Sequence, residues 1–499
     1  MRQSRRWAQR GKAKDEKEEY IMKTRAVLGT AVLAALLMGA ALSAHADEDR
    51  IRPYENNPTY WQYKGEPVLL LGGSNQDNLF NHPNLGPDGL EAHLDLLVSV
   101  GGNYVRNTMS SRDRVHPDSD FHNDDNRYAF HLDEETGLYD LNRFDDEFWQ
   151  RFRDFLEMTA ERDIIVQIEI WDRWDYGPDT YGVAWSGHPF NPDNNINYTR
   201  EQTGLPEEGT HDYPIFRTVP ELDDIPVVLA YQEAYVEELL SISLQYDHVL
   251  YCISNETTSP EEWSRHWARF VHAQAEQAGV GVEVTEMWNH WDLTNPMHRR
   301  TFDYPELYSF ADTSQNTHQV EQTHWDNMLE ARQLIADPPR PMNNVKIYGG
   351  ERHGGGTEEG THKLWRNILG GCAASRFHRP ALNDSGVGLS EMAQTHLRSA
   401  RMFTSEFDVF TVEPRNDLLT EREPNEAYCA AHPGEAYAVY FTDGGSVELD
   451  LTDANGAFRV RWLNILDSEW TDETEVQAGG SIELMPPGDG QWLAVLLSE

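Results

Sequence analysis

The sequence is poor in cysteine and in positive charge. It has three cysteines in 499 residues, Cys252, Cys372 and Cys429, and their spacing fits neither a disulfide framework nor a zinc site. Lysine and arginine together number 41 against 84 aspartate and glutamate residues, which gives a formal net charge of −43 at pH 7. Such a charge repels phosphate backbones and anionic lipid, so we expect no nucleic-acid partner and no membrane-surface partner.

Only one long hydrophobic run occurs, at residues 26–42. Lys23 and Arg25 precede it, and a small-x-small site at residues 44–46 follows it. The run is short for a membrane span and has the flanks of a secretory signal peptide. We therefore expect residues 1–46 to be an upstream extension plus a Sec-type bacterial signal peptide, and the mature protein to be secreted or periplasmic. After residue 46 the only lysines are Lys64, Lys346 and Lys363.

Short apolar runs alternate with segments of helical period over most of the chain. Eight of these runs read as strands: 68–71, 103–108, 164–170, 248–254, 282–287, 310–313, 345–348 and 373–377. Parallel neighbours need a crossover, and eight such units close a barrel of about 250 residues or more. The pattern predicts an α/β fold, a (β/α)8 TIM barrel over residues 47–405. An open doubly wound sheet is the rival if the strand count is wrong by one.

The pattern changes near residue 406. From there, period-two apolar segments alternate with Gly, Asp and Pro turns, and no helical period is present. We expect a C-terminal antiparallel β-sandwich domain over residues 406–499. Such a domain either binds carbohydrate or braces the barrel, and the bracing role is the one we favour.

Chemistry in a barrel of this kind collects at the carboxyl ends of its strands. Asn255 and Glu256 follow the fourth predicted strand, and Glu351 follows the seventh. Alternation places Glu351 on the same face of its strand as Val345 and Ile347. If that face points inward, the carboxylates of Glu256 and Glu351 meet across the mouth of the barrel. Two carboxyl groups about 5–5.5 Å apart are what retaining glycoside hydrolysis needs.

Further candidates lie at the other strand ends. Guanidinium, amide and imidazole groups hydrogen-bond sugar hydroxyls, and indole rings stack on sugar faces. The candidate substrate-binding residues are Arg106, Asn107, Trp171, Trp174, Trp288, His318 and His378, with Trp185 and Trp291 as further platforms. Glu169 and Glu286, which end the third and fifth predicted strands, are the alternative catalytic carboxylates.

The Asn-Glu pair at strand four and the Glu at strand seven resemble those of clan A glycoside hydrolases. Residues 64–72 (KGEPVLLLG) and the small C-terminal β-domain resemble, more narrowly, the apiosidase-like catalytic-domain group. Residues 74–76 (SNQ) depart from that group's pattern, which puts apiose as the substrate in doubt.

The clan resemblance implies a role for three residues. Glu256 would be the acid/base, Glu351 the nucleophile, and Asn255 a donor to the sugar 2-hydroxyl. The acid has to hold a proton, so we expect burial and the charge of Glu351 to raise the pKa of Glu256. The implied reaction is hydrolysis of a plant or algal polysaccharide or oligosaccharide, without a cofactor.

Four other classes of function are weighed against this one. No His-Glu-x-x-His or Gly-x-Ser-x-Gly motif occurs, which argues against a zinc hydrolase and a serine hydrolase, so we expect neither a metal nor a cofactor. A polysaccharide lyase would use an Arg and a His or Tyr, and the loops are rich in these. A non-catalytic carbohydrate-binding protein also stays open, as do the sugar, the linkage and the oligomeric state.

Overall fold

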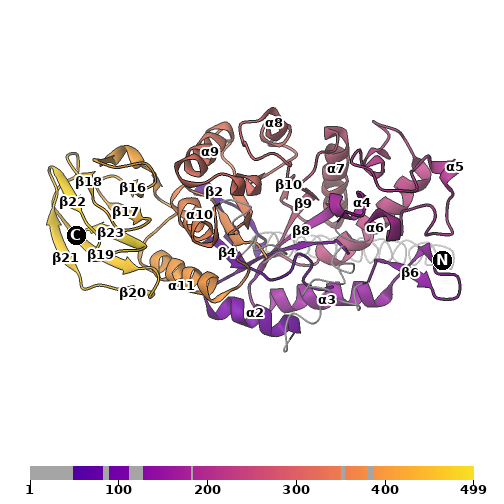
Figure 1. The fold of residues 1–499 in the computed structure, drawn as a ribbon, viewed down its shortest axis with the longest axis horizontal. Helices are drawn as coiled ribbons and strands as arrows, with labels where there is room; N and C mark the ends of the chain where they lie inside the picture. Colours follow the sequence, from indigo (N-terminus) through magenta and orange to yellow (C-terminus); the bar gives the residue numbers. More distant parts are fainter. Residues whose placement is uncertain (1–48, 82–88, 112–126, 181–183, 350–354, 380–386) are drawn as a thin grey trace, which may run out of the picture. The chain divides into compact units, whose positions relative to one another are not determined.

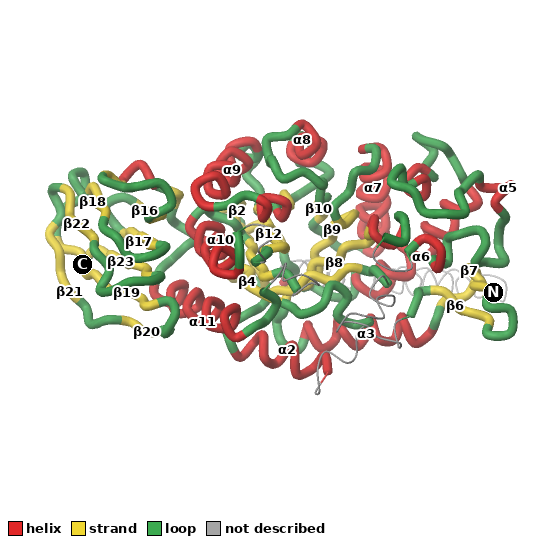
Figure 2. The backbone as a smooth tube through the Cα atoms, in the orientation of Figure 1, coloured by secondary structure: helices red, strands yellow, loops and turns green. Residues whose placement is uncertain are grey.

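A parallel sheet of eight strands forms the centre of the protein, in the order β10-β9-β8-β5-β4-β13-β12-β11 (Figures 1 and 2). In chain order the strands are β4 (Leu70–Gly73), β5 (Tyr104–Thr108), β8 (Ile165–Asp172), β9 (Val249–Asn255), β10 (Val284–Thr285), β11 (Ala311–Asp312), β12 (Met342–Ile347) and β13 (Ala374–Phe377). At the two edges, the Ser309 N–H donates to the Val284 carbonyl (3.0 Å) and the Thr285 hydroxyl donates to the Phe310 carbonyl (2.7 Å). The sheet is therefore a nearly closed barrel, and the predicted (β/α)8 fold is confirmed.

The computed structural model describes residues 49–81, 89–111, 127–180, 184–349, 355–379 and 387–499. The chain from Arg50 to Glu499 is one compact unit. The larger helices around the barrel are α2 (Gly89–Ser99), α3 (Asp146–Ala160), α6 (Pro226–Ser243), α7 (Glu261–Ala278), α8 (Pro296–Phe302), α9 (Glu321–Leu334), α10 (Thr357–Leu369) and α11 (Glu391–Glu406) (Figure 1).

Helix α3 shows why these segments are helical. Its buried residues Phe148, Phe152 and Phe155 recur at helical spacing and form one apolar face. The Asp145 carboxylate accepts a hydrogen bond from the Phe148 N–H, which satisfies one of the free donors at the helix start.

The N-terminal end of the barrel is covered by a small antiparallel sheet of β1 (Arg52–Tyr54), β2 (Asn57–Tyr63) and β3 (Glu66–Val68). Trp61 of β2 is fully buried there. Its indole N–H donates to the Asn343 side-chain oxygen (2.9 Å), and its ring meets Phe310 edge-on at 5.2 Å. The sequence places the first barrel strand at 68–71, but that stretch spans the end of β3 and the start of β4. The apolar run continues from β3 of the small sheet into β4 of the barrel, so the sequence pattern does not show where one sheet ends and the other begins.

The C-terminal part of the chain forms two antiparallel sheets (Figure 2). The first contains β14 (Glu413–Pro414), β16 (Ala427–His432), β17 (Ala436–Phe441), β23 (Trp492–Ser498), β19 (Ala457–Asn464), β20 (Glu469–Trp470) and β21 (Thr474–Gln477); the second contains β15 (Leu419–Thr420), β18 (Val447–Asp450) and β22 (Ser481–Leu484). Apolar side chains of both sheets share one core, as in a sandwich.

The C-terminal sheets contact the barrel helices through buried polar groups. The Ser399 hydroxyl of α11 donates to the Ile465 carbonyl (2.7 Å), and the Gln491 amide donates to the Thr361 hydroxyl of α10 (3.0 Å). These contacts suit a domain that braces the barrel.

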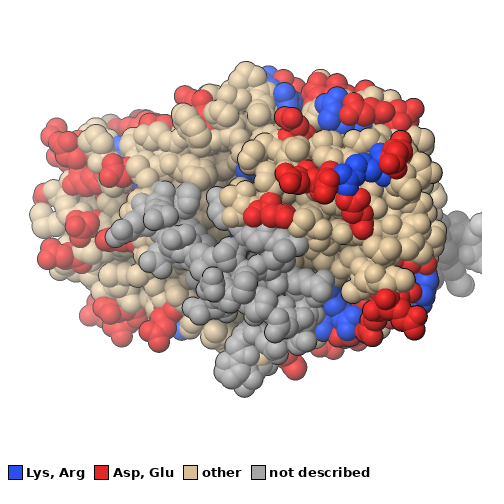
Figure 3. Space-filling model, turned by 45° about the vertical axis from the view of Figure 1, so that its right-hand side comes forward, with Lys and Arg blue, Asp and Glu red and all other residues tan. Residues whose placement is uncertain are grey.

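The surface carries the acidic charge that the composition predicts. Figure 3 shows Asp and Glu side chains over much of the visible face and Lys and Arg in fewer places. Within the described ranges, no helix combines the length and apolar character needed to cross a membrane.

Replacing Trp61 by Ala tests the role of the small sheet at the base of the barrel. The change removes a buried ring and its hydrogen bond to Asn343, so we expect the free energy of unfolding to fall by about 3–5 kcal/mol. Urea denaturation measures this loss. Trp291→Ala is the matched control, because Trp291 is 55% exposed and should leave the unfolding midpoint nearly unchanged. Equal losses of unfolding free energy in the two variants would contradict the stabilising role of Trp61 at the base of the barrel.

Candidate active site

Asn255 and Glu256 lie at the end of β9, the fourth barrel strand, on the carboxyl face of the sheet. Glu256 has a backbone φ of 50°, in the left-handed region that a residue with a Cβ seldom adopts. Such strain is of the order of 1–3 kcal/mol and is concentrated at functional sites. Here the turn lets two consecutive side chains reach the same neighbour, the ammonium group of Lys346.

The Glu256 carboxylate is held by donors from three other strand ends, those of β8, β11 and β12. Its Oε1 accepts from Lys346 Nζ (2.6 Å), Gln315 Nε2 (3.3 Å) and the Tyr348 hydroxyl (3.4 Å). Its Oε2 accepts from Trp174 Nε1 (3.1 Å) and Arg173 Nη2 (3.4 Å). Only 7% of the residue is exposed, so these contacts form largely away from solvent.

Lys346 joins the two residues of the Asn-Glu pair. Its Nζ donates to the Asn255 side-chain oxygen (2.5 Å) as well as to Glu256. Lys346 thereby fixes the orientation of the Asn255 side-chain amide. Burial lowers the pKa of Lys346, and the charge of Glu256 opposes that shift.

The contacts of Glu256 act against one expectation from the sequence. Lys346 and Arg173 are cations, and each favours the ionised form of a carboxylate that it touches. The expected surroundings were burial and a second negative charge, which favour the protonated form. The two cations, Lys346 and Arg173, were not part of that expectation. Their contact with Glu256 depends on how strands that are far apart in the sequence meet in the barrel.

The predicted alternation of the seventh barrel strand does not hold along β12, because the pairing register of this strand shifts between Asn344 and Ile347. Asn343 contacts Tyr104 and Gln167 inside the barrel. Beyond the irregularity, Lys346 and Tyr348 contact Glu256. Glu351, the predicted nucleophile, lies outside the described residues.

Arg106 belongs to a buried ion-pair network below the site. Its guanidinium donates to Asp77 (2.6 Å) and Glu169 (2.6 Å), and all three side chains are at most 1% exposed. Arg379 also pairs with Asp77. Arg106 and Glu169 therefore set the charge beneath the mouth of the barrel, and the structure does not bring Glu169 to Glu256.

Asn107 holds the backbone near the first strand end. Its side-chain oxygen accepts from the Leu79 N–H (2.6 Å), and its amide donates to the Thr108 carbonyl (3.0 Å). The residue is fully buried, so the structure assigns it to the loop rather than to a ligand.

The tryptophan candidates separate into two groups. Trp171 packs against Trp263 and Trp267 of α7 at 5.5 and 5.0 Å, and Trp288 donates from its indole N–H to the Thr301 hydroxyl (2.7 Å). Trp171, Trp185 and Trp288 are each at most 2% exposed and belong to the core. Trp174 touches Glu256, and Trp291 is exposed.

Both histidine candidates lie beside Tyr348. The His378 ring meets the Tyr348 ring edge-on at 4.7 Å, and the His318 ring lies 5.7 Å from it. Burial lowers the pKa of His378 well below its usual value, and the Asp77 carboxylate opposes that shift. His318 is exposed at the end of the 3-10 turn η4 (Ser314–His318).

A cavity of about 570 Å³ opens next to Glu256. It is lined by Asn289, His290, Trp291, Gln315, His318 and Gln319, which follow β10 and β11. Gln315 both lines this cavity and donates to Glu256, so the cavity and the carboxylate belong to one site.

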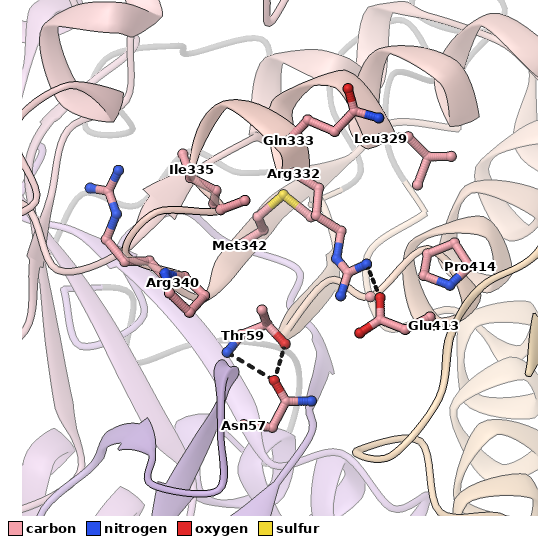
Figure 4. Close-up of a pocket in the computed structure, with 13 residues that line it drawn as sticks. Asn57, Thr59, Leu329, Arg332, Gln333, Ile335, Arg340, Met342, Glu413 and Pro414 are labelled. Atoms are coloured by element: carbon pink, nitrogen blue, oxygen red, sulfur yellow. Dashed lines mark hydrogen bonds and ion pairs between the residues drawn. The ribbon is translucent and has the colours of Figure 1, made fainter. Parts of the chain in front are cut away.

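A second cavity, of about 460 Å³, lies at the other end of the barrel (Figure 4). Its lining includes Asn57 of β2, Met342 at the start of β12, and Arg332, which pairs with Glu413 of β14. The amino-terminal face of a barrel of this type serves stability, and this cavity holds none of the side chains around Glu256. We therefore assign it no catalytic role.

Four residues that contact Glu256 were not among the site residues predicted from the sequence: Lys346, Tyr348, Arg173 and Gln315. Lys346 offered a signal, because it is one of three lysines after residue 46 and stands between Val345 and Ile347. A charged residue inside an apolar strand is buried only when it is paired.

Glu286 is buried behind the site, on the backbone side of β9. Its Oε1 accepts from the N–H groups of Ser254 (2.8 Å) and Met287 (2.9 Å). Burial raises its pKa to about 8, against the opposing effect of these hydrogen bonds. Glu286 thus anchors the strand end that carries Asn255, and the described contacts do not bring it to Glu256.

Comparison with known proteins shows likeness in fold alone. No protein-family model matches the chain, and no curated protein matches it. A solved structure named glycoside hydrolase superposes with a TM-score of 0.61 at 11% identity over 91% of this chain and 98% of that one. A family 5 glycoside hydrolase from Bacteroides vulgatus superposes with a TM-score of 0.61 at 12% identity, over 91% of this chain and 95% of that one. The chain shares the fold of glycoside hydrolases.

A third solved structure has a bound sugar. It is a family 5 mannosidase from Rhizomucor miehei in complex with mannosyl-fructose, with a TM-score of 0.50 at 11% identity over 73% of this chain and 99% of that one.

Among the residues that the structure describes, no group of three or more His, Cys, Asp or Glu side chains is arranged to hold a metal ion.

Glu286→Gln tests the buried carboxyl behind the site. The pKa of Glu286 is about 8 in the folded chain against an ordinary value of 4.5, so the unfolded chain loses the proton first. Folding stability therefore falls as pH rises from about 4.5 to about 8. The Gln variant has no such loss. Its free energy of unfolding, relative to that of wild type, should therefore rise by on the order of 1–3 kcal/mol between pH 5 and pH 8.

Urea unfolding at both pH values measures the difference. Glu134→Gln, an exposed change on the hairpin of β6 (Phe130–Asp133) and β7 (Leu138–Phe144), is the control. A Glu286→Gln variant whose stability tracks that of wild type across this range would contradict the assignment.

Proposed function

We propose that the protein is a secreted, retaining glycoside hydrolase that acts on a plant or algal polysaccharide or oligosaccharide. The observation that carries the proposal is the Asn255–Glu256 pair at the fourth strand end, strained, buried and beside a cavity at the barrel mouth. The fold likeness to glycoside hydrolases supports it. The narrower apiosidase-like resemblance of the sequence stays a prediction.

The proposed first step transfers the sugar to the enzyme. Glu256 donates its proton to the glycosidic oxygen, the bond from the anomeric carbon to that oxygen breaks, and the leaving sugar departs as an alcohol. The Glu351 carboxylate forms an ester with the anomeric carbon. Asn255 donates from its side-chain NH₂ group to the 2-hydroxyl, an interaction that strengthens in the transition state.

The second step releases the sugar. Ionised Glu256 takes a proton from water, the water oxygen bonds to the anomeric carbon, and the ester bond to Glu351 breaks. The product has the same anomeric configuration as the substrate, because two inversions have occurred.

Lys346 gives this mechanism a pH dependence. In the first step Glu256 has to be protonated, and the adjacent ammonium group disfavours that form. In the second step Glu256 is ionised, and the same ammonium group stabilises it. We expect the enzyme to work best at acidic pH.

A uronate lyase is the second candidate. Arg173 and Tyr348 stand close to Glu256, and an Arg with a Tyr base is the set that a lyase needs. However, the Arg173 guanidinium already contacts Glu256 and the Trp174 ring (4.7 Å to its centroid), which leaves it less able to neutralise a uronate. The products separate the two reactions, because a lyase creates a double bond that absorbs ultraviolet light.

Glu256→Gln and Glu351→Gln test the proposal on a panel of plant and algal glycans and mannosides. Each variant should lower kcat by about 10²–10⁴-fold, since each removes one proton transfer or the nucleophile. Product chromatography gives the rates, and Glu134→Gln should match wild type. Products that absorb near 230–240 nm (about the range of such enol double bonds) would support the lyase instead. Full turnover in both Gln variants would overturn the two-carboxylate assignment.

Lys346→Met tests the link between Lys346 and the acid. Without the ammonium group, Glu256 should keep its proton to higher pH, and the descending limb of the rate profile should move up by about one pH unit. Lys346→Arg should keep the limb near its wild-type position. Lys64→Met, the same change at an exposed lysine, is the control. A limb that stays in place in Lys346→Met would refute this link.

A further inference from the structure

Trp291 is unusual among the tryptophans of the described chain, because its ring is exposed. It is 55% exposed, and the other large exposed apolar residues in the described ranges are aliphatic. The ring borders the cavity next to Glu256. An exposed indole on the wall of a cavity is a surface on which the apolar face of a ligand stacks.

The backbone of Trp291 is held in place. Its carbonyl accepts from Asn327 Nδ2 (3.2 Å) and Gln319 Nε2 (3.5 Å), and the Asn327 side-chain oxygen accepts from the Leu293 N–H (3.1 Å). The His290 ring stacks against the Trp291 ring at 5.4 Å with an interplanar angle of 27°. One face of the indole thus contacts the His290 ring, and hydrogen bonds from Asn327 and Gln319 fix the backbone at Trp291.

Asn327 also ties the two walls of the cavity together. Its Nδ2 donates to the Asn316 side-chain oxygen (2.7 Å). Asn316 belongs to η4, the turn that carries Gln315 and His318. The wall that bears Trp291 and the wall that bears Gln315 are therefore fixed relative to each other before any ligand binds, which lowers the entropy cost of binding.

The charge of the cavity defines its ligand. Among the described lining residues none is Lys, Arg, Asp or Glu; they comprise three amides, two imidazoles and one indole. Both ring nitrogens of His290 already bond to Asp292 and Asn295, so this imidazole contributes its ring face. Amides and imidazoles hydrogen-bond hydroxyl groups, and an indole stacks on the apolar face of a sugar. A uronate or a sulfated sugar would find no counter-ion here and would meet the field of an acidic protein.

The position of the cavity limits which sugar it holds. Gln315 links the cavity to Glu256, the residue that the proposed function makes the proton donor. A proton donor lies against the glycosidic oxygen, which joins the leaving sugar to the sugar that the nucleophile attacks, so a cavity beside the donor holds one of these two sugars.

We propose that this cavity binds the leaving-group sugar of the substrate, that this sugar is uncharged, and that it stacks on Trp291. The assignment of the leaving side rests on the proposed function; the assignment of an uncharged sugar rests on the cavity alone.

Calorimetric titration tests the uncharged sugar. The Glu256→Gln protein is titrated with cellobiose, mannobiose, galactobiose and xylobiose, and with digalacturonate. At least one neutral disaccharide should bind, digalacturonate should bind more weakly, and adding Trp291→Ala should lower the affinity about tenfold. Trp291→Phe should recover part of it. Leu466→Ala, at a residue 51% exposed elsewhere, should have no effect.

Tighter binding of digalacturonate, no binding of any neutral disaccharide, or unchanged affinity in Trp291→Ala would overturn the proposal. Loss of binding in Trp291→Ala without any hydrolysis by wild type would uphold the sugar site and remove the proposed function. Hydrolysis that depends on Glu256 but not on Trp291 would uphold the proposed function and remove the sugar site at Trp291.

Kinetics on two substrates of one sugar test the leaving side. The glycosyl fluoride of the sugar that wild type releases has no leaving sugar, whereas the matching disaccharide has one. Trp291→Ala should lower kcat/KM about tenfold for the disaccharide and leave the fluoride unchanged. An equal loss on both substrates would place Trp291 on the other side of the bond.

Discussion

The contact of the Lys346 ammonium group with Asn255 and Glu256 is the interaction on which the site depends. It joins the fourth and seventh barrel strands at the mouth, fixes the orientation of the Asn255 amide and balances the charge of a buried carboxylate. A buried ion pair contributes little to stability, since desolvation offsets the attraction of the two charges. Its presence is better explained by the chemistry of Glu256 than by folding.

This pair is the top of a polar column that runs through the barrel. At the base, Trp61 donates to Asn343, whose amide contacts Tyr104 and Gln167. Above them Arg106 pairs with Asp77 and Glu169, and Lys346 with Glu256 comes last. Barrel interiors are more often filled by branched apolar side chains. Here the interior is held by hydrogen bonds, so the site is supported from below by groups of fixed geometry.

The polar column explains what the sequence predicts and what it does not. The eight strands and the C-terminal sheets follow from apolar period, because the outer faces of barrel strands pack against helices whatever the interior contains. The inward positions of β12 do not follow, since the register shift between Asn344 and Ile347 interrupts the alternation and brings Lys346 and Tyr348 to Glu256. Trp171 and Trp288 read as platforms in sequence, yet packing against helices removes both from the surface.

Azide rescue of a Glu256→Ala variant tests the central claim most directly. The substrate is the glycosyl fluoride, whose leaving group needs no proton. In a retaining hydrolase the alanine variant therefore still forms the ester on the nucleophile, and azide attacks it without a general base. The account predicts that azide restores turnover and that the product is a glycosyl azide with the anomeric configuration of the substrate, as read by NMR. No rescue, or an azide of inverted configuration, would contradict the role of Glu256 as the acid/base.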